Sequence, residues 1–134
     1  MKIGMIGLGR MGMNMARRLL QGSHQIVTHN RTPDKTEELI KEGATGAFSL
    51  RELVENLAAP RVVWLMLPAG KPVDNHMKQL RGLLSPGDII IVEGGNSRYN
   101  DDIRRVEELN GSGIHYLDAG VSGGIWGSRS ATAP

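Results

Sequence analysis

The sequence predicts an α/β protein with a doubly wound, mainly parallel sheet of six strands and helices on both faces. Three observations lead to this prediction. Short apolar runs alternate with segments of helical periodicity along the chain. Glycine is abundant, with 18 residues among 134, which suits many tight turns. Aromatic residues make up only 4%, which argues against an aromatic-rich β-sandwich.

The strands are predicted from short apolar runs that are followed by glycine or polar residues. The run 61–67 (RVVWLML) is almost continuously apolar, as in a strand buried on both faces. The run 44–47 is the weakest of the set. The predicted strands are 2–6, 25–29, 44–47, 61–67, 89–92 and 114–118.

The helices between them are predicted from apolar residues three and four apart and from end signals. Thr32 followed by Pro33 is typical of an N-cap and a first helical turn. Ser49 and Glu52 have the spacing of a capping box. The predicted helices are 11–20, 33–41, one that follows Ser49, 72–84 and one that opens at 100–103. The residues expected to face inward are Met11, Met15, Ala16, Leu19 and Leu20, then Leu50, Leu53, Val54 and Leu57, then Ile103, Val106 and Leu109.

Composition excludes several classes of function. The formal net charge is only +2 and no Lys/Arg run occurs, which argues against nucleic acid as a partner. There is no cysteine, and the four histidines lack metal-ligand spacing, so no metal site is expected. No apolar run approaches the roughly 20 residues of a membrane span, and residues 1–9 lack a convincing signal-peptide cleavage site. We therefore expect a cytoplasmic protein.

Residues 7–12 (GLGRMG) form the pattern G-x-G-x-x-G between a predicted strand and a predicted helix. Gly7 permits the tight turn, Gly9 allows backbone approach to a pyrophosphate, and Gly12 allows close helix packing. The N–H groups at the helix start then face the anion. The alternative is a glycine-rich turn without a ligand. With the intervening Leu8, Arg10 and Met11, this loop is the predicted dinucleotide site of a Rossmann-like domain.

The end of the second strand bears on the choice of cofactor. Sites specific for NAD place Asp or Glu there to bond the ribose 2′-OH. This chain has Asn30, Arg31 and Thr32 instead. A guanidinium can pair with a 2′-phosphate, and Asn30 and Thr32 add neutral donors. We predict a preference for NADP, with NAD possible as a cofactor. The alternative is that Thr32 only caps a helix and Arg31 is solvated.

Two further motifs follow predicted strands. Residues 93–97 (EGGNS) place Asn96 after a buried strand, and residues 122–124 supply Ser122, Gly123 and Gly124 after the last one. Ligands of a doubly wound sheet lie outside the carboxyl ends of its strands. An amide, a hydroxyl and exposed N–H groups suit a ligand rich in hydroxyls with a carboxylate or phosphate. The alternative for each motif is a simple turn.

Taken together, five segments resemble the 6-phosphogluconate dehydrogenases, in particular the shorter bacterial forms. The likeness covers nearly all of residues 1–127. The pair GGNS and SGGxWG is its specific part, because the glycine loop alone fits many dehydrogenases. The segments are GLGRMG, HNRTPDK, RVVWLMLPAG, GDIIIVEGGNS and YLDAGVSGGIWG.

The resemblance implies oxidation of 6-phosphogluconate at C3 by NADP, or NAD in some members, with loss of CO₂ to give ribulose 5-phosphate and no metal. It assigns the pyrophosphate loop to residues 7–12 and the 2′-phosphate site to residues 30–32. Leu67, Pro68 and Ala69 would line the cofactor, although the family often has Lys in the segment matched by Pro68. Asn96 would contact cofactor and substrate, and residues 122–124 would contact substrate.

The resemblance also implies parts that this sequence does not contain. We expect a dinucleotide-binding domain over residues 1–127 and a frayed or altered tail over residues 128–134. The family's catalytic Lys and Glu lie downstream, in an all-helical domain that supplies the usual dimer interface. We therefore expect no catalytic residue in this chain, negligible turnover by it alone, and a homo-oligomeric full-length form, either a dimer or a tetramer.

Two alternatives remain open. The β-hydroxyacid dehydrogenases, such as 3-hydroxyisobutyrate dehydrogenase, share the glycine loop and a segment similar to residues 118–124, but they normally lack GGNS. A non-catalytic NADP-binding fragment is the alternative from a different class.

Overall fold

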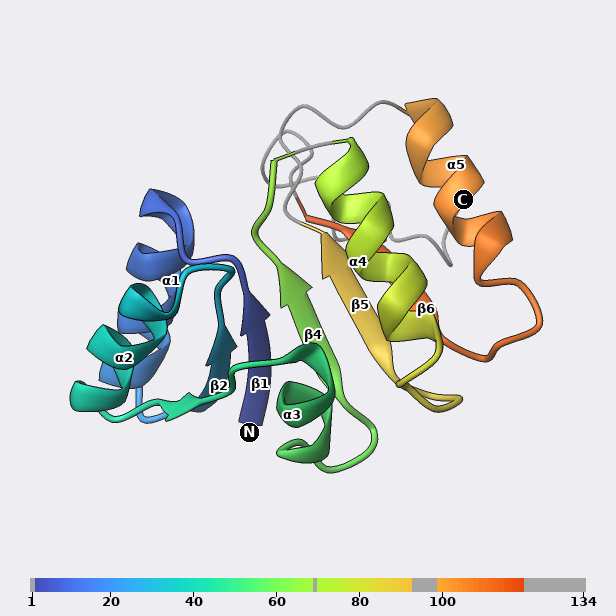
Figure 1. The fold of residues 1–134 in the computed structure, drawn as a ribbon. Coiled ribbons are helices and arrows are strands. Elements are labelled where there is room, and N and C mark those ends of the chain that lie inside the picture. The colour runs from blue at the N-terminus through green and yellow to red at the C-terminus, as the bar shows by residue number, and fades with distance from the viewer. Residues whose placement is uncertain (1, 69, 93–98, 120–134) are drawn as a thin grey trace.

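The computed structural model describes residues 2–68, 70–92 and 99–119, in which strands and helices alternate (Figure 1). The described strands are β1 (Lys2–Ile6), β2 (Gln25–His29), β3 (Thr45–Gly46), β4 (Val62–Leu65), β5 (Ile89–Val92) and β6 (His115–Asp118). The described helices are α1 (Arg10–Gln21), α2 (Pro33–Lys41), α3 (Leu50–Glu55), α4 (Lys71–Arg81) and α5 (Tyr99–Glu108). The predicted α/β class is confirmed.

The six strands form one sheet in the order β3-β2-β1-β4-β5-β6, and all its neighbouring strands pair in parallel. The chain starts at β1 in the middle, winds outward to β3, and returns to β4 to wind outward the other way (Figure 1). This reversal between β1 and β4 is where doubly wound sheets bind ligands, outside the carboxyl ends of the strands.

The carboxyl ends of four strands lie in line. Ile6 pairs with Leu65, Leu65 with Val92, and Val92 with Asp118. The segments that follow these strands therefore leave the sheet at one edge. That edge carries the glycine loop.

Apolar side chains fill both faces of the sheet. On one face α1 and α2 cover Ile3, Met5 and Ile26. On the other face α3 and α4 pack with Val63 and Ile90. Since both faces of the sheet are buried, successive residues of a strand are apolar, and this explains the near-continuous apolar runs in the sequence.

Four elements are shorter than the sequence predicts: the strands 44–47 and 114–118 are observed as β3 and β6, and one helix and one further strand also lose residues at their ends. The predicted helix 72–84 ends at Arg81, with Gly82 as its C-cap. The backbone N–H groups of Leu83 and Leu84 both donate to Leu80, which makes a turn, yet both side chains still pack against the core. Apolar spacing therefore continues past the helix. The predicted strand 61–67 is reduced to β4. At its start, the backbone N–H of Arg61 donates to a side-chain atom, Oδ1 of Asp88, at 2.7 Å.

Three residues predicted to face inward are exposed, so that prediction was wrong for them. Ile103 and Val106 on α5 are 41% and 38% exposed, and Met11 at the start of α1 is 63% exposed. The third residue predicted there, Leu109, is buried just past the end of α5, and on α5 itself Arg105 is buried four residues before it. Arg105 is placed by an ion pair of 2.9 Å with Asp74 of α4. The helical period was right, but a polar contact rotated the buried stripe.

None of the helices in the described ranges is long and apolar enough to cross a membrane.

Candidate functional site

The turn after β1 requires glycine at position 7 for two reasons. Gly7 has a φ of +96°, which L side chains rarely adopt. A Cβ atom there would also lie 2.5 Å from the carbonyl oxygen of Met66. The N–H of Gly7 donates to the carbonyl of His29 at 3.0 Å, which ties the turn to the end of β2.

Gly9 and Gly12 have different surroundings. A Cβ atom on Gly12 would lie 2.1 Å from the carbonyl oxygen of Gly7, so α1 packs directly on the turn. A Cβ atom on Gly9 would meet nothing within 4 Å, and its backbone is extended, with a φ of −70°. No conformational or packing constraint therefore accounts for Gly9. The space before it is open, which fits a dinucleotide that approaches the backbone there.

The N-terminus of α1 presents free backbone donors at this open space. Gly9 is the N-cap, and the N–H of Met13 donates to its carbonyl at 2.8 Å. The N–H groups of Arg10, Met11 and Gly12 precede this bond and have no acceptor within the helix. The first turn of α1 contains no acidic residue. Its partial positive charge therefore favours an anion such as a pyrophosphate.

Asn30 connects the glycine loop to the loop after β2. Its Oδ1 accepts a hydrogen bond of 2.8 Å from the N–H of Leu8. Its Nδ2 donates to the carbonyl and to Oγ1 of Thr32, at 3.1 and 3.2 Å. The amide group is thus engaged on both sides, and Asn30 holds the two loops at a fixed separation.

Thr32 and Arg31 are both exposed beside this connection. Thr32 occupies the predicted N-cap position of α2, but its side chain makes no capping bond. The capping prediction is therefore corrected in one respect: Oγ1 accepts from Asn30 and does not serve the helix. The exposed guanidinium of Arg31 is available to an anion at the end of β2.

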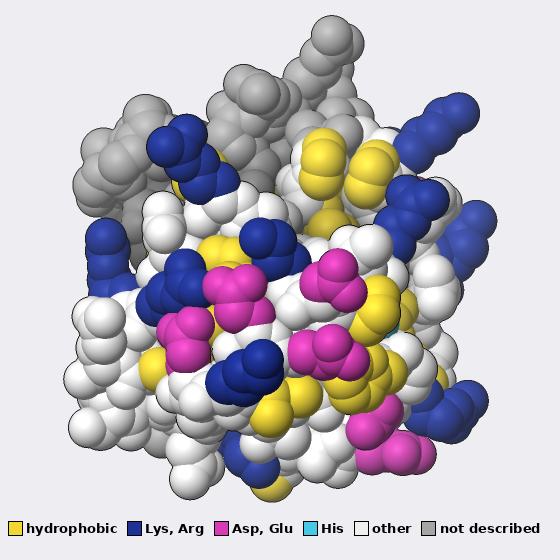
Figure 2. Space-filling model, turned by 60° about the vertical axis from the view of Figure 1, so that its left-hand side comes forward, with side chains coloured by type: hydrophobic (Ala, Val, Ile, Leu, Met, Phe, Trp, Pro, Cys, Tyr) yellow, Lys and Arg dark blue, Asp and Glu magenta, His cyan; other side chains and the backbone are white. Residues whose placement is uncertain are grey.

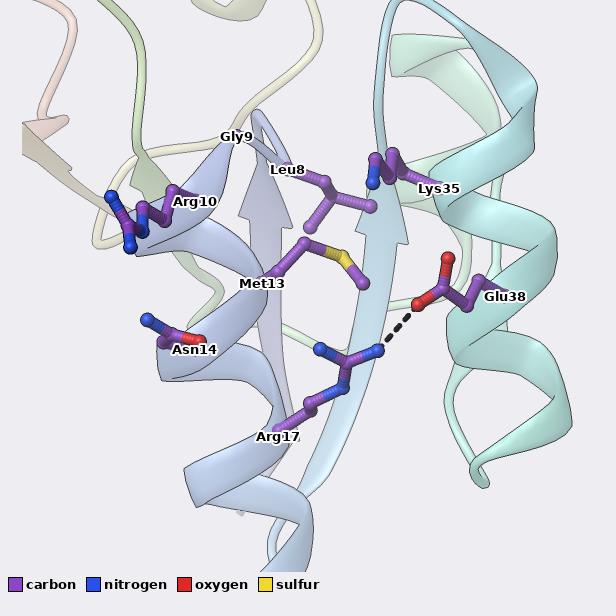
Figure 3. Close-up of a pocket in the computed structure, with 8 residues that line it drawn as sticks. All are labelled: Leu8, Gly9, Arg10, Met13, Asn14, Arg17, Lys35 and Glu38. Atoms are coloured by element: carbon purple, nitrogen blue, oxygen red, sulfur yellow. Dashed lines mark hydrogen bonds and ion pairs between the residues drawn. The ribbon is translucent and has the colours of Figure 1, made fainter.

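A pocket of about 310 Å³ opens between the starts of α1 and α2. Figure 3 shows Leu8 and Met13 directed into it, with polar side chains from both helices around them. Its lining residues are Leu8, Gly9, Arg10, Met13, Asn14, Arg17, Lys35 and Glu38. Figure 2, with the side of α1 and α2 turned forward, shows basic and acidic side chains lying next to one another. The pocket adjoins the glycine loop, so it is part of the same candidate site.

Sequence reasoning missed Lys35 and Arg17 in this pocket. Lys35 lies in the first turn of α2, four residues after Arg31, and this spacing at a helix start was the available signal. Arg17 lies on α1, and its guanidinium bonds to Glu38 of α2 and to Glu42, the C-cap residue of α2. Hydrogen bonding to Arg17 lowers the pKa of Glu42. Which helices face one another is a tertiary property, so local sequence gave no signal for Arg17.

The segment after β4 lies against the glycine loop. A Cβ atom on Gly7 would lie 2.9 Å from Cδ2 of Leu67, so the structure brings these two predicted residues together. Pro68 is exposed at the same edge. The other predicted site residues, which are Ala69, Asn96, Ser122, Gly123 and Gly124, lie outside the described residues, as does the predicted tail 128–134. Within the described ranges, no cluster of three or more His, Cys, Asp or Glu is placed to hold a metal ion.

A glycine turn, an open helix N-terminus and a topological switch point together define a dinucleotide-binding domain of the doubly wound type. Comparison with known families agrees. The chain belongs to the family described as the NAD binding domain of 6-phosphogluconate dehydrogenase, whose model matches residues 2–133.

Individual relatives carry the same name. The NAD(+)-dependent, decarboxylating 6-phosphogluconate dehydrogenase of Bacillus subtilis is 42% identical over 130 residues, which is 94% of this chain and 28% of that protein. The solved Plasmodium falciparum 6-phosphogluconate dehydrogenase, studied in its apo form, with NADP+ and with 6-phosphogluconate, superposes with a TM-score of 0.82 at 35% identity. That match covers 96% of this chain and 29% of the other.

A second kind of dehydrogenase also matches. The structure of Mycobacterium tuberculosis 3-hydroxyisobutyrate dehydrogenase with L-serine superposes with a TM-score of 0.79 at 28% identity, over 95% of this chain and 42% of the other. The chain spans less than half the length of its curated relatives, 43% for one and 26–28% for the others compared.

Proposed function

We propose that this chain binds NADP and is the cofactor-binding part of an oxidoreductase that converts 6-phosphogluconate to ribulose 5-phosphate. NADP, when bound, supplies the hydride acceptor for oxidation at C3 of the substrate. The chain's own contribution is to bind and orient the dinucleotide. The single observation that carries the proposal is the glycine loop, in which Gly9 leaves open space before the free N–H groups of α1.

The preference for NADP rests on the charges at the end of β2. No acidic residue stands at positions 30–32, where an NAD-specific site would place one. Arg31 is exposed there, and Lys35 lines the adjoining pocket. Two cations, with no carboxylate at positions 30–32, favour a 2′-phosphate over a 2′-hydroxyl.

The choice of 6-phosphogluconate as substrate is supported by the relatives. Curated 6-phosphogluconate dehydrogenases are 40–42% identical to the chain, whereas the 3-hydroxyisobutyrate dehydrogenase structure is 28% identical. The motif at residues 94–97 (GGNS), with Asn96 proposed to contact cofactor and substrate, favours the same choice. Residues 122–124 are proposed to contact substrate. We assign no catalytic residue in this chain and expect negligible turnover by it alone.

Binding measurements with two arginine variants test the cofactor site. We expect isothermal titration of the 134-residue chain to give a dissociation constant at least about tenfold lower for NADP than for NAD. The substitution Arg31→Ala should remove most of this difference and leave NAD binding unchanged. Arg81→Ala is the matched control, because Arg81 is exposed at the end of α4, far along the helix from the carboxyl edge of the sheet. Equal affinities for the two dinucleotides in the parent chain would contradict the proposal.

A further inference from the structure

Arg17 is the side chain that joins α1 to α2 across the floor of the pocket. Its Nη2 donates to Glu38, and its Nε donates to both carboxylate oxygens of Glu42, at 3.0 and 3.2 Å. Nη2 also donates to Glu42 at 3.0 Å. One guanidinium thus serves two carboxylates of the neighbouring helix, and Figure 3 shows its contact with Glu38 inside the pocket.

Glu38 is the only acidic side chain among the residues that line this pocket. It lies on the same helix as Lys35, three residues further on, and both side chains line the pocket. A phosphate monoester carries about −1.5 to −2 charges at neutral pH. An uncompensated carboxylate in this pocket would repel it, in the same way that an acid at the end of β2 does in NAD-specific sites.

We propose that Arg17 strengthens the preference for NADP by neutralising Glu38. This inference rests on the proposed function, since it assumes that a 2′-phosphate binds beside Arg31. Arg17 acts through Glu38 and is a positioning residue, not a direct ligand. With Arg17 in place the pocket presents Lys35 to the phosphate, while the negative charge of Glu38 is paired with Arg17 of α1.

A cycle of variants separates this role from direct contact with the phosphate. The dissociation constants for NADP and NAD are measured for the parent chain, Arg17→Gln, Glu38→Gln and the double variant. Arg17→Gln should lower the ratio of NADP to NAD affinity about fivefold, because it frees one unit charge near the phosphate. The double variant should return the ratio to within about twofold of the parent.

Two controls locate the effect. Arg18→Gln changes the same charge one residue along α1, on an exposed side chain, and should leave the ratio unchanged. Arg17→Gln combined with Glu42→Gln should stay as low as Arg17→Gln alone, because Glu42 does not line the pocket. If circular dichroism shows that Arg17→Gln does not fold, the proposal is tested by Glu38→Gln alone. It should raise the ratio or leave it unchanged, and a fall would overturn the proposal.

An unchanged ratio in Arg17→Gln would overturn the proposal. So would a double variant that stays as low as the single variant, because Arg17 would then contact the phosphate itself. Neither result affects the proposed NADP site, whose failure would appear as equal affinities in the parent chain or as no effect of Arg31→Ala.

Discussion

Asn30 accepts a hydrogen bond of 2.8 Å at Oδ1 from the backbone N–H of Leu8. This bond joins the loop after β1 to the loop after β2. Because Asn30 also donates to Thr32, the two loops that flank the candidate cofactor site form one hydrogen-bonded unit. We therefore propose that Asn30 supports both the pyrophosphate site and the 2′-phosphate site.

Removing this connection should affect both cofactors alike. We expect Asn30→Ala to weaken NADP and NAD binding by similar factors and to lower the free energy of unfolding by about 1 kcal/mol, the usual net value of a hydrogen bond. Titration calorimetry and urea denaturation measure the two effects. Arg31→Ala serves as the contrast, because it should weaken NADP binding only. A selective loss of NADP binding in Asn30→Ala would show direct recognition of the 2′-phosphate instead.

Alanine substitutions at Gly9 and Gly12 should have different effects on dinucleotide binding and on the free energy of unfolding. We expect Gly9→Ala to change the free energy of unfolding by no more than about 1 kcal/mol, since its Cβ meets nothing within 4 Å. The same variant should lose about tenfold in dinucleotide affinity. Gly12→Ala should cost about 3 kcal/mol of stability, because its Cβ would lie 2.1 Å from the carbonyl oxygen of Gly7. Thermal unfolding of both variants checks this; a stable Gly12→Ala chain would refute the packing role.

Local features of this site were predictable from the sequence, while features that depend on helix packing were not. Glycine at position 7 follows from a positive φ, and glycine at position 12 follows from the close packing of α1 on the turn. The cap at Ser49 was also confirmed, since the N–H of Glu52 donates to its Oγ at 3.0 Å, although the Glu52 carboxylate accepts from the N–H of Phe48 and not from that of the N-cap residue. Arg17 could not be assigned to the pocket, because its role depends on which face of α1 meets α2.

The buried carboxylate of Asp88 should control stability in acid. Burial alone would raise its pKa, but hydrogen bonds from the N–H groups of Arg61 and Ser85 and from the Arg61 side chain outweigh burial and lower it. The stabilisation is therefore complete above the unfolded-state pKa of about 3.9 and is lost as the pH falls through the lower folded-state value.

Asp88→Ala should accordingly lower the free energy of unfolding by about 3 kcal/mol at pH 7. As the pH is lowered from 5 to 2 in steps of about one unit, the free energy of unfolding of the variant should also fall less steeply than that of the parent. Denaturation at each pH provides the measurement, and Glu55→Ala, an exposed residue on α3, is the control. Parallel pH profiles for Asp88→Ala and the parent would argue against this account.

Arg105 makes a different prediction, because its guanidinium is fully buried between α4 and α5. Removing its partner with Asp74→Ala should cost about 3 kcal/mol, since it leaves a buried charge with a weaker set of contacts. Among the described residues, its remaining partners are the Tyr116 hydroxyl at 3.4 Å and Asp102 at 4.0 Å. The substitution Arg105→Met, which removes the buried charge itself, should lower the free energy of unfolding by less than Asp74→Ala does. Urea denaturation that ranks the two variants in the opposite order would contradict this prediction.

The most direct test of the cofactor site is a two-dimensional ¹H–¹⁵N NMR titration of the labelled chain with NADP and, separately, with NAD. The amide signals of Gly9, Arg10 and Met11 should shift with both dinucleotides, because both carry the pyrophosphate. The signals of Arg31 and Lys35 should shift strongly with NADP and weakly with NAD. Shifts that spare the glycine loop, or that are identical at Arg31 for the two cofactors, would contradict the account.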